Sequence, residues 1–261
     1  MEIIKSKDNK TIKYISKLIK SSKFRKEENS FVVEGVRMCE EALKNNAVIE
    51  YLVYSVSSFD KHTDIIKRLT DKAFSTYCVE DRIFCALSDT KTPQGVLCVV
   101  KTLDKQAHFD TIKKNGILLA LDNIQDPTNL GTILRSADAL GISGVILSSD
   151  CCDVYSPKVT RGSMGAIFRM PFYITKDLPA FIASFNEHGT SYACVLDDAA
   201  TKISEVKFTA PVLSVIGNEG NGISFDVINA CNKKLYIPMY NNAESLNAAV
   251  AASIIMWEMS K

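Results

Sequence analysis

The sequence predicts an α/β protein that is built from two domains. Two series of alternating strand-like and helix-like segments run along the 261 residues, one on each side of a polar stretch. Several strands of the second series are apolar throughout, which is typical of a parallel sheet covered on both faces. We therefore expect an N-terminal domain at residues 1–103, a linker at 104–115 and a C-terminal domain at 116–261.

The composition is that of an ordinary globular protein. Hydrophobic residues make up 46% and charged residues 23%, which argues against a disordered, collagen-like or coiled-coil chain. No apolar run reaches the roughly 18 residues of a membrane-spanning helix. The start, MEIIKSKDNK, lacks the apolar core of a signal peptide, so we expect a cytoplasmic protein. The eight cysteines form no CxxC pair, and this predicts buried, reduced thiols and no metal site.

The net charge of +1 conceals an uneven distribution of charge. Residues 1–26 contain nine Lys or Arg and two acidic residues, a net charge of +7, so the remaining residues sum to −6. A basic segment on a slightly acidic body indicates a polyanionic partner that is met at one end. A solvated, lysine-rich helix explains the composition equally well.

The first series of elements begins with an amphipathic helix. Ile12, Ile15 and Leu18 recur at helical spacing, with lysines mainly on the opposite face. A short strand at 31–33, a helix at 36–45 and a strand at 49–55 follow. The series then continues with helices at 64–72 and 81–88 and with strands at 74–79 and 95–100. Residues 101–115 are polar and only weakly periodic, which favours a linker there.

The second series supplies five expected strands with helices between them. The strands are expected at 117–121, 144–149, 191–196, 211–217 and 234–238, and the helices at 129–140, 157–164, 178–187, 223–232 and 245–259. Three segments, 122–142, 213–224 and 236–261, each carry polar, glycine- or asparagine-bearing residues just after a strand. Ligands bind at the carboxyl ends of strands in such sheets, so these segments are candidates for a site.

In the first segment, Asp126-Pro127 marks a turn, and Thr128 or Asn129 can cap the helix that follows. Arg135 lies nearly two helical turns beyond Asn129. A capped helix with one surface arginine explains the same residues without any ligand.

In the second segment, a strand ends at Gly217, and further glycines follow as far as Gly222. Glycine lets the backbone approach a ligand closely. The spacing matches neither of the two common phosphate-binding loops, and Glu219 would repel a phosphate. A neutral or cationic ligand fits better, while a glycine-rich turn before a helix remains the simpler explanation.

In the third segment, a strand ends at Pro238, and Ser245 and Asn247 stand at the start of a long apolar helix. A helix that is apolar almost all round is usually buried, and at a C-terminus the burial is often against a partner subunit. The alternative is a core helix with a polar N-cap.

Together, these segments resemble the signature motifs of the SpoU (TrmH) family of RNA ribose 2′-O-methyltransferases, in the SPOUT superfamily. The matching residues are Asn129-Leu130-Gly131 through Arg135 and Ala137, Gly217 to Gly222 around Glu219, Ile237-Pro238, and Ser245-Leu246-Asn247 with Ala248 and Ala249. The stretches at 161–171, 31–37 and 92–97 also look like the family. The resemblance thus covers nearly the whole chain, and three motifs in order are more specific than any one of them.

The resemblance implies a fold and a cofactor. The N-terminal domain is similar to the family's substrate-binding domain, which is an α/β domain like ribosomal protein L30e. The C-terminal domain would be a SPOUT α/β domain with a deep trefoil knot, a feature that periodicity cannot reveal. The family is dimeric, so a homodimer through this domain is implied. The knotted loops would bind S-adenosylmethionine, with the pocket formed by Leu196, Gly217, Ile237, Met239 and Leu246.

The resemblance also assigns catalytic roles. The ribose hydroxyl must lose its proton as the methyl group arrives, and the family gives that role to the arginine that matches Arg135. An arginine base is costly because its pKa exceeds about 12, so a cation that grips the neighbouring phosphate is the second possibility. Asn129, Glu219, Ser245 and Asn247 would orient the groups around it. His62, His108 and His188 lie outside every motif.

We therefore expect an S-adenosylmethionine-dependent 2′-O-methyltransferase that acts on structured RNA, with ribosomal RNA favoured over tRNA. The basic N-terminal region would dock the RNA through Lys10, Lys13, Lys17, Lys20, Arg25 and Arg37. Two other hypotheses stay open, a tRNA methyltransferase and a catalytically silent RNA-binding or ribosome-assembly factor. A general nucleotide-binding protein is disfavoured, because no recognised phosphate loop is present. No metal and no membrane partner is expected.

Overall fold

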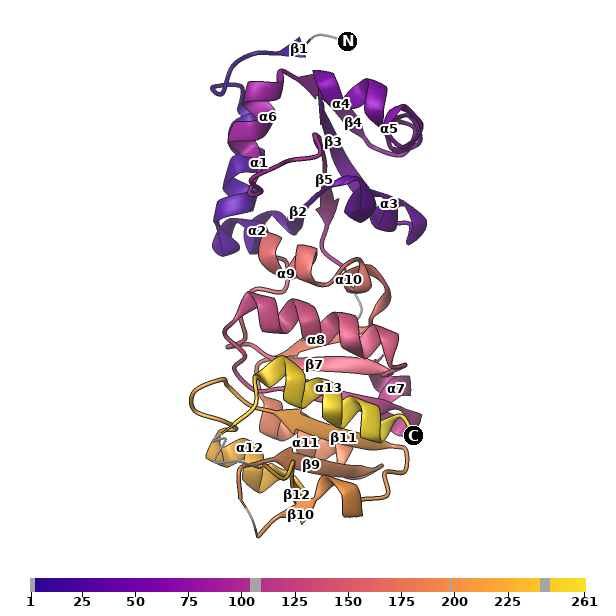
Figure 1. Cartoon of the computed structure of the whole chain (residues 1–261), viewed down its shortest axis with the longest axis vertical. Helices are drawn as coiled ribbons and strands as arrows, with labels where there is room; N and C mark the ends of the chain where they lie inside the picture. The colour runs from indigo at the N-terminus through magenta and orange to yellow at the C-terminus, as the bar shows by residue number, and fades with distance from the viewer. Residues whose placement is uncertain (1–2, 104–108, 198, 240–244) are drawn as a thin grey trace. The chain divides into compact units, whose positions relative to one another are not determined.

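The structure is a computed structural model of the chain, and it describes residues 3–103, 109–197, 199–239 and 245–261 (Figure 1). The chain divides into two compact units. Unit 1 comprises Met1–Leu103 and Tyr155–Phe168, and unit 2 comprises Asp104–Val154 and Arg169–Lys261. None of the helices in the described ranges has the length and apolar character that a membrane crossing requires.

Unit 1 contains a five-stranded mixed sheet in the order β1-β4-β3-β5-β2. Its strands are β1 (Ile3–Ile4), β2 (Ser30–Glu34), β3 (Ile49–Ser55), β4 (Ser75–Val79) and β5 (Val96–Lys101). The strand β5 runs antiparallel to both of its neighbours, and the other pairs are parallel. The helices are α1 (Lys10–Lys20), α2 (Ser22–Glu28), α3 (Val36–Lys44), α4 (Val56–Lys61), α5 (Thr63–Thr70) and α6 (Asp81–Leu87).

The helices α1 and α6 pack against the same set of strand residues. Ile12, Ile15 and Leu18 of α1 share one buried cluster with Ile83, Phe84 and Leu87 of α6 and with Val32, Val53, Val79, Leu97 and Val99 of the sheet. Burial of the apolar face of α1 leaves the lysines of its other face in solvent, as the helical spacing predicts.

Unit 1 is completed by a segment that lies far away in the sequence. Residues 155–168 contain α9 (Pro157–Gly162) and most of α10 (Ala166–Arg169). The ring of Tyr155 lies 4.6 Å from that of Phe31, centroid to centroid, and its hydroxyl exchanges hydrogen bonds with both backbone groups of Leu103. Arg161 donates to Asp89 at 2.8 Å. The segment is therefore an integral part of unit 1.

Unit 2 contains a seven-stranded sheet in which every pair of neighbours is parallel, in the order β10-β12-β9-β11-β6-β7-β8. Its strands are β6 (Ile117–Leu121), β7 (Gly144–Ser148), β8 (Phe172–Thr175), β9 (Thr190–Cys194), β10 (Thr201–Lys202), β11 (Val212–Ile216) and β12 (Lys233–Tyr236). Its helices are α7 (Phe109–Asn115), α8 (Pro127–Ala139), α11 (Leu178–Phe185), α12 (Phe225–Ala230) and α13 (Ala248–Met259), with a 3₁₀ turn at Ile203–Glu205.

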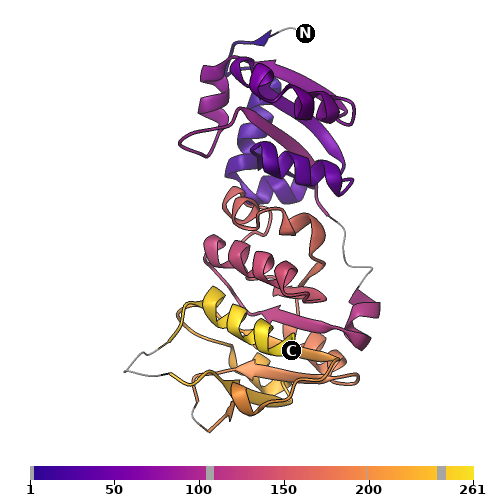
Figure 2. The same ribbon diagram turned by 45° about the vertical axis from the view of Figure 1, so that its right-hand side comes forward.

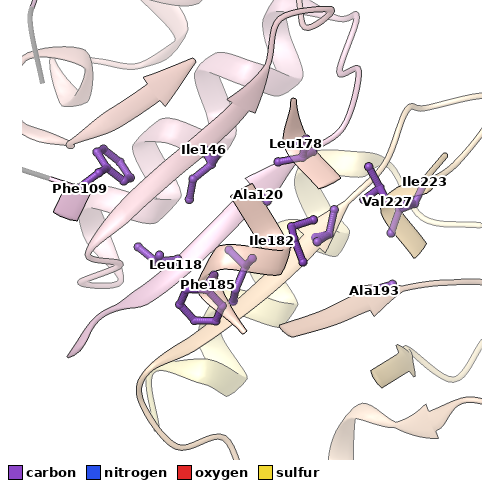
Figure 3. Packing of buried hydrophobic residues seen from close by; sticks show 12 residues of the cluster. Phe109, Leu118, Ala120, Ile146, Leu178, Ile182, Phe185, Ala193, Ile223 and Val227 are labelled. Atoms are coloured by element: carbon purple, nitrogen blue, oxygen red, sulfur yellow. The ribbon is translucent and has the colours of Figure 1, made fainter. Parts of the chain in front are cut away.

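The main core of unit 2 lies between the sheet and the helices α7, α11 and α12. Figure 3 shows Phe109, Ile182 and Phe185 packed around the strand residues Leu118 and Ile146. The helices α8 and α13 run side by side in both ribbon views (Figure 1 and Figure 2), and Ser253 of α13 donates to Ser136 of α8 at 3.1 Å.

The expected strands of the second series are all present, and their ends lie within two residues of the prediction. Of the expected linker, residues 104–108 lie outside the described residues, whereas 109–115 form α7, and its Phe109 is buried in the core of unit 2. All eight cysteines are free, as expected, but only Cys39, Cys78 and Cys98 are buried; Cys85 is exposed and the other four are partly exposed, contrary to expectation. The trefoil knot stays a prediction.

Candidate active site

The candidate site lies at the carboxyl ends of four neighbouring parallel strands. The strands β12, β9, β11 and β6 are adjacent in the sheet, so the segments that follow them meet at one edge. These segments are residues 237–239, 195–197, 217–222 and 122–126. All three predicted polar segments contribute to this edge.

The loop after β11 folds back on itself. Asn218 and Gly222 exchange two backbone hydrogen bonds of 2.9 and 3.0 Å, and the Asn218 side chain accepts from the amides of Gly220 and Asn221. A Cβ atom placed on Gly217 would lie 2.2 Å from the carbonyl carbon of Gly222. Only glycine therefore fits at position 217 in this loop.

Glu219 connects the β11 loop to the start of α8. Its carboxylate accepts hydrogen bonds from the amides of Gln125 and Asp126, both at 3.0 Å, and from Nδ2 of Asn129 at 2.9 Å. Partial burial acts to raise the pKa of Glu219, but these hydrogen bonds, with that of Asn129 the strongest, outweigh it and hold the pKa below its ordinary value. Glu219 is therefore a carboxylate at neutral pH.

Two asparagines extend this network to α13. Asn129 is buried, and its Oδ1 accepts from Nδ2 of Asn247 at 2.9 Å. Asn247 in turn caps α13, because its Oδ1 accepts from the amides of Ala249 and Val250. A relay of side chains therefore joins the β11 loop, the first turn of α8 and the first turn of α13.

A cavity of about 320 Å³ opens beside this relay. All five residues predicted to bind the cofactor line it, namely Leu196, Gly217, Ile237, Met239 and Leu246, together with the predicted catalytic residues Glu219 and Ser245. Further apolar lining comes from α13, through Ala248, Ala251 and Ile255, and from the strand ends, through Val195 and Ile216. The volume is within the range of small-molecule sites.

The lining of the cavity fits S-adenosylmethionine. Apolar side chains such as Ile237 and Leu246 can cover the faces of an adenine ring, while backbone groups at the strand ends offer hydrogen bonds to its edge. The carboxylate of Glu219 at the wall is compatible with a cationic sulfonium and unfavourable for a phosphate. The described residues contain no group of three side chains that could hold a metal ion.

Arg135 lies outside this cavity. It is exposed on α8 and has no hydrogen-bond or ion-pair partner among the residues that the structure describes. Asn129, Glu219 and Asn247 are thus brought together by hydrogen bonds, with Ser245 at the same cavity, whereas the predicted central residue stands apart. One copy of the chain therefore does not bring all the predicted catalytic residues together at one cavity.

The helix α13 is buried on one side only. Its buried residues include Ala248, Ala252, Ile255 and Met256, but 48% of Val250 and 54% of Trp257 are exposed. The sequence predicts a buried helix, either in the core or against a partner subunit; within one copy the face of Val250 and Trp257 is exposed, so the core-helix alternative does not account for it. Two large apolar side chains on one exposed helix face are typical of an interaction surface.

Among the predicted RNA-binding residues, Arg25 requires a correction. Its side chain is buried, and its guanidinium donates to the carbonyl oxygens of Leu18 and Ile19 at the end of α1. It therefore satisfies helix carbonyls that lack an internal partner, and it is not on the surface for RNA. Lys10, Lys13, Lys17, Lys20 and Arg37 are exposed.

Sequence reasoning missed two residues that shape the site. Asn218 donates from Nδ2 to the carbonyl oxygen of Asn123 at 2.8 Å and thereby joins the ends of β11 and β6. Asp122, which is buried, accepts from the amide of Ser224 at the other side of the glycine loop. Their position directly after apolar strands was the available signal.

Comparison with known proteins identifies the family of the chain. The SpoU rRNA Methylase family matches residues 116–257, and an MRM3-like substrate binding domain matches residues 9–98. The chain is 30% identical to the 23S rRNA (guanosine(2553)-2′-O)-methyltransferase RlmP of Bacillus subtilis, over 99% of each chain. An AdoMet-bound rRNA methyltransferase from Sinorhizobium meliloti has a TM-score of 0.87, with 26% identity over 99% of this chain and 97% of that one. The SpoU methyltransferase AviRb from Streptomyces viridochromogenes, in complex with AdoMet, has a TM-score of 0.85 and 26% identity over 97% of each chain.

Proposed function

This chain belongs to the SpoU rRNA methylase family, and from that membership we propose that it methylates a ribose 2′-hydroxyl of ribosomal RNA with S-adenosylmethionine as the methyl donor. The observation that carries the proposal is the cavity at the strand ends, where all the predicted cofactor residues meet. The name of the Bacillus subtilis relative supports both the RNA class and the hydroxyl that is methylated.

The residues of the cavity would bind and orient the cofactor. S-adenosylmethionine supplies an electrophilic methyl group on a cationic sulfur. Gly217 brings the β11 backbone close to the cavity, and Ile237 and Leu246 exclude water from its apolar part. The relay of Glu219, Asn129 and Asn247 fixes the relative positions of the three loops. Cofactor geometry therefore depends on a network that is already formed in the free protein.

We propose that Arg135 acts at the cavity of a second copy in a homodimer. Two observations support this: Arg135 does not line the cavity of its own chain, and α13, which packs beside α8, exposes Val250 and Trp257. Within such a shared site, the guanidinium would hold the phosphate next to the target ribose and stabilise the developing alkoxide, and the hydroxyl proton would pass to solvent water as the methyl group is transferred. The alternative role of Arg135 as the general base requires it to lose a proton that arginine holds strongly.

Other substrates and roles are less well supported. An intact relay and cavity are expected of an active enzyme, so a catalytically silent RNA-binding factor is disfavoured. A tRNA substrate remains the nearest alternative within the same chemistry. The bacterial relative also supports a cytoplasmic location.

The decisive experiment combines cofactor binding with methyl transfer. Calorimetry should show that the wild type binds S-adenosylmethionine without RNA, and radiolabelled methyl groups should be transferred to unmodified ribosomal RNA. Arg135→Ala should keep the cofactor affinity and lose about a hundred- to thousandfold in rate, as expected for one positioned electrostatic stabiliser. Transfer to tRNA in preference to ribosomal RNA would mean that tRNA is the substrate. Absence of cofactor binding by the wild type would reject the proposal.

A further inference from the structure

Unit 1 carries a groove between α1 and α6 that the candidate active site does not use. The groove has a volume of about 430 Å³, and four lysines line it: Lys7, Lys13, Lys17 and Lys20. Its floor is apolar and comes from both helices, through Ile12 of α1 and through Ile83 and Leu87 of α6. A neighbouring hollow shares Lys7 and Ile83 with the groove and adds Lys5 and Arg82.

The lysines of α1 form a regular row along one side of the groove. Lys13, Lys17 and Lys20 are four and three residues apart, which places them on one helix face at steps of about 6 and 4.5 Å along the axis. Lys10 is exposed on the same helix but does not line the groove. Only part of the basic N-terminal segment therefore lines the groove.

The charge of the groove is largely uncompensated. No acidic side chain is among the described residues that line it. Within the described ranges, Lys7, Lys17 and Lys20 have no carboxylate partner, whereas Lys13 pairs with Asp8 at 2.7 Å. That pair is exposed, with 61% and 87% of the two side chains accessible, so a stronger anion can displace Asp8 at little cost.

The lining also indicates what kind of anion fits. The described lining residues include no aromatic ring, so the groove offers no platform on which bases could stack. It offers a row of ammonium groups beside an apolar floor, which suits the evenly spaced phosphates of a nucleic-acid strand. The match of residues 9–98 to a substrate binding domain favours RNA over an acidic protein as the source of these charges.

We propose that the groove between α1 and α6 holds the phosphate backbone of one strand of the RNA substrate, independently of base sequence. This inference rests on the proposed function, because it identifies where that substrate is held. The hollow that contains Lys5 and Arg82 would continue the path of the strand beyond α1. The groove thus supplies affinity, and the choice of the target nucleotide is made elsewhere.

The first test compares two triple variants of equal charge. Lys7→Gln/Lys17→Gln/Lys20→Gln neutralises the groove, whereas Lys23→Gln/Lys26→Gln/Lys72→Gln neutralises three exposed lysines of unit 1 outside it. Binding of a fluorescein-labelled oligouridine is titrated at several salt concentrations. The groove variant should bind about tenfold or more weakly, and its slope of log affinity against log salt should be shallower by about 2. The control variant should keep the wild-type affinity and slope.

The second test reaches the groove from α6 without changing a lysine. Ala86 lines the groove and its neighbour Cys85 does not, although both are exposed. Ala86→Glu should weaken oligouridine binding, whereas Cys85→Glu, with the same added charge one residue away, should bind like the wild type. Thermal unfolding confirms that both variants are folded.

The outcomes separate the two proposals. An equal loss of oligouridine affinity in both triple variants would mean that only the net charge matters. An unchanged affinity of the groove variant would mean that RNA docks elsewhere. Either result overturns the inference. Competition by polyglutamate as strong as that by unlabelled oligouridine would assign the groove to an acidic protein. Failure of the wild type to bind S-adenosylmethionine or to methylate RNA would instead reject the proposed function, whatever the groove binds.

Discussion

At the scale of single residues, one carboxylate determines the orientation of two amide side chains. Glu219 can only accept hydrogen bonds, so Asn129 must direct its NH₂ group toward it. The Oδ1 atom of Asn129 then faces Asn247, which must donate and keeps its own Oδ1 atom for the cap of α13. The direction of every bond in the relay follows from the charge at one end.

Asn129→Asp should break this relay while hardly changing the volume of the side chain. The new carboxylate would face Oε1 of Glu219, which lies 2.9 Å from the present amide nitrogen. Loss of the buried donor should cost about 1–3 kcal/mol of unfolding free energy at pH 7. Thermal unfolding measures this, as a fall in Tm of several degrees.

The pH dependence of that loss has a defined sign. In the wild type the folded-state pKa of Glu219 lies below its unfolded value of about 4.3, so its contribution is complete above that pH and is lost as the pH falls through the folded pKa. In Asn129→Asp the paired carboxylates repel, and protonation relieves the repulsion as the pH falls. The difference in unfolding free energy between the wild type and Asn129→Asp should therefore become smaller below about pH 5. A difference that stayed constant from pH 7 to pH 4 would contradict this account of the relay.

Arg25 and Arg135 show which properties of a single charged residue can be predicted from sequence. Both were recognised as cations, and the helix that carries Arg135 was predicted, whereas α2, which carries Arg25, was not. The burial of Arg25 against the end of α1 could not be predicted, because it depends on how α1 and α2 meet. The resemblance identified Arg135, but the spacing of residues could not show that it lies outside the cavity of its own chain.

At the scale of elements, the β11 loop depends on close contact between its own backbone segments. Gly217→Ala would place a Cβ atom 2.2 Å from backbone atoms of Gly222, which must then move. We expect a loss of about 1–3 kcal/mol in stability together with loss of cofactor binding. Gly220→Ala is the matched control, because its Cβ atom would meet only Asn218 Oδ1, at 3.7 Å. Calorimetry that found the cofactor bound equally well by both variants would contradict the role given to Gly217.

The elements that sequence predicted well are those whose burial is visible in their composition. The runs ILLAL and IEYLVYS became β6 and β3 with the predicted ends, because apolar residues in a strand leave few other ways to bury them. The helix α2, SKFRKEE, was missed because only Phe24 marks its apolar side. The helix α7 was taken for linker because Phe109 and Ile112 alone contact the core. One or two apolar side chains are too few to give a hydrophobic periodicity that the sequence can reveal.

At the scale of the whole molecule, a shared active site predicts complementation between two inactive chains. Arg135→Ala removes the residue that we propose acts on the other copy, and Ala251→Phe should fill the cavity, since Ala251 lines it. A mixture that is unfolded and refolded together should recover about a quarter of the wild-type rate, because half of its dimers are mixed and each of these has one intact site out of two.

The same experiment has a control on α13. Trp257→Glu in both chains should prevent recovery and give monomers in sedimentation, because it places a charge on the exposed apolar face. No recovery from mixed chains that do form dimers would show that each copy uses its own Arg135.

The two units are not consecutive stretches of sequence. Residues 155–168, between strands β7 and β8 of unit 2, belong to unit 1 and pack on Phe31. Cleavage near residue 115 would therefore leave α9 without the residues that cover Tyr155 and Phe168. It would also remove Phe109 from the core of unit 2. The methylase part is better studied by point variants of the full chain than by truncation.

This arrangement has a consequence for how the protein is made on the ribosome. Proteins commonly fold their N-terminal part first, while the rest of the chain is still being synthesised. Here the N-terminal part has to wait, because Phe31 is not covered until residue 168 has left the exit tunnel. At ordinary rates of translation residue 168 leaves the tunnel about 3–13 s after Leu103 has left it. For those seconds the nascent chain presents the uncovered aromatic side chain, and a chaperone would have its opportunity to bind before α9 arrives.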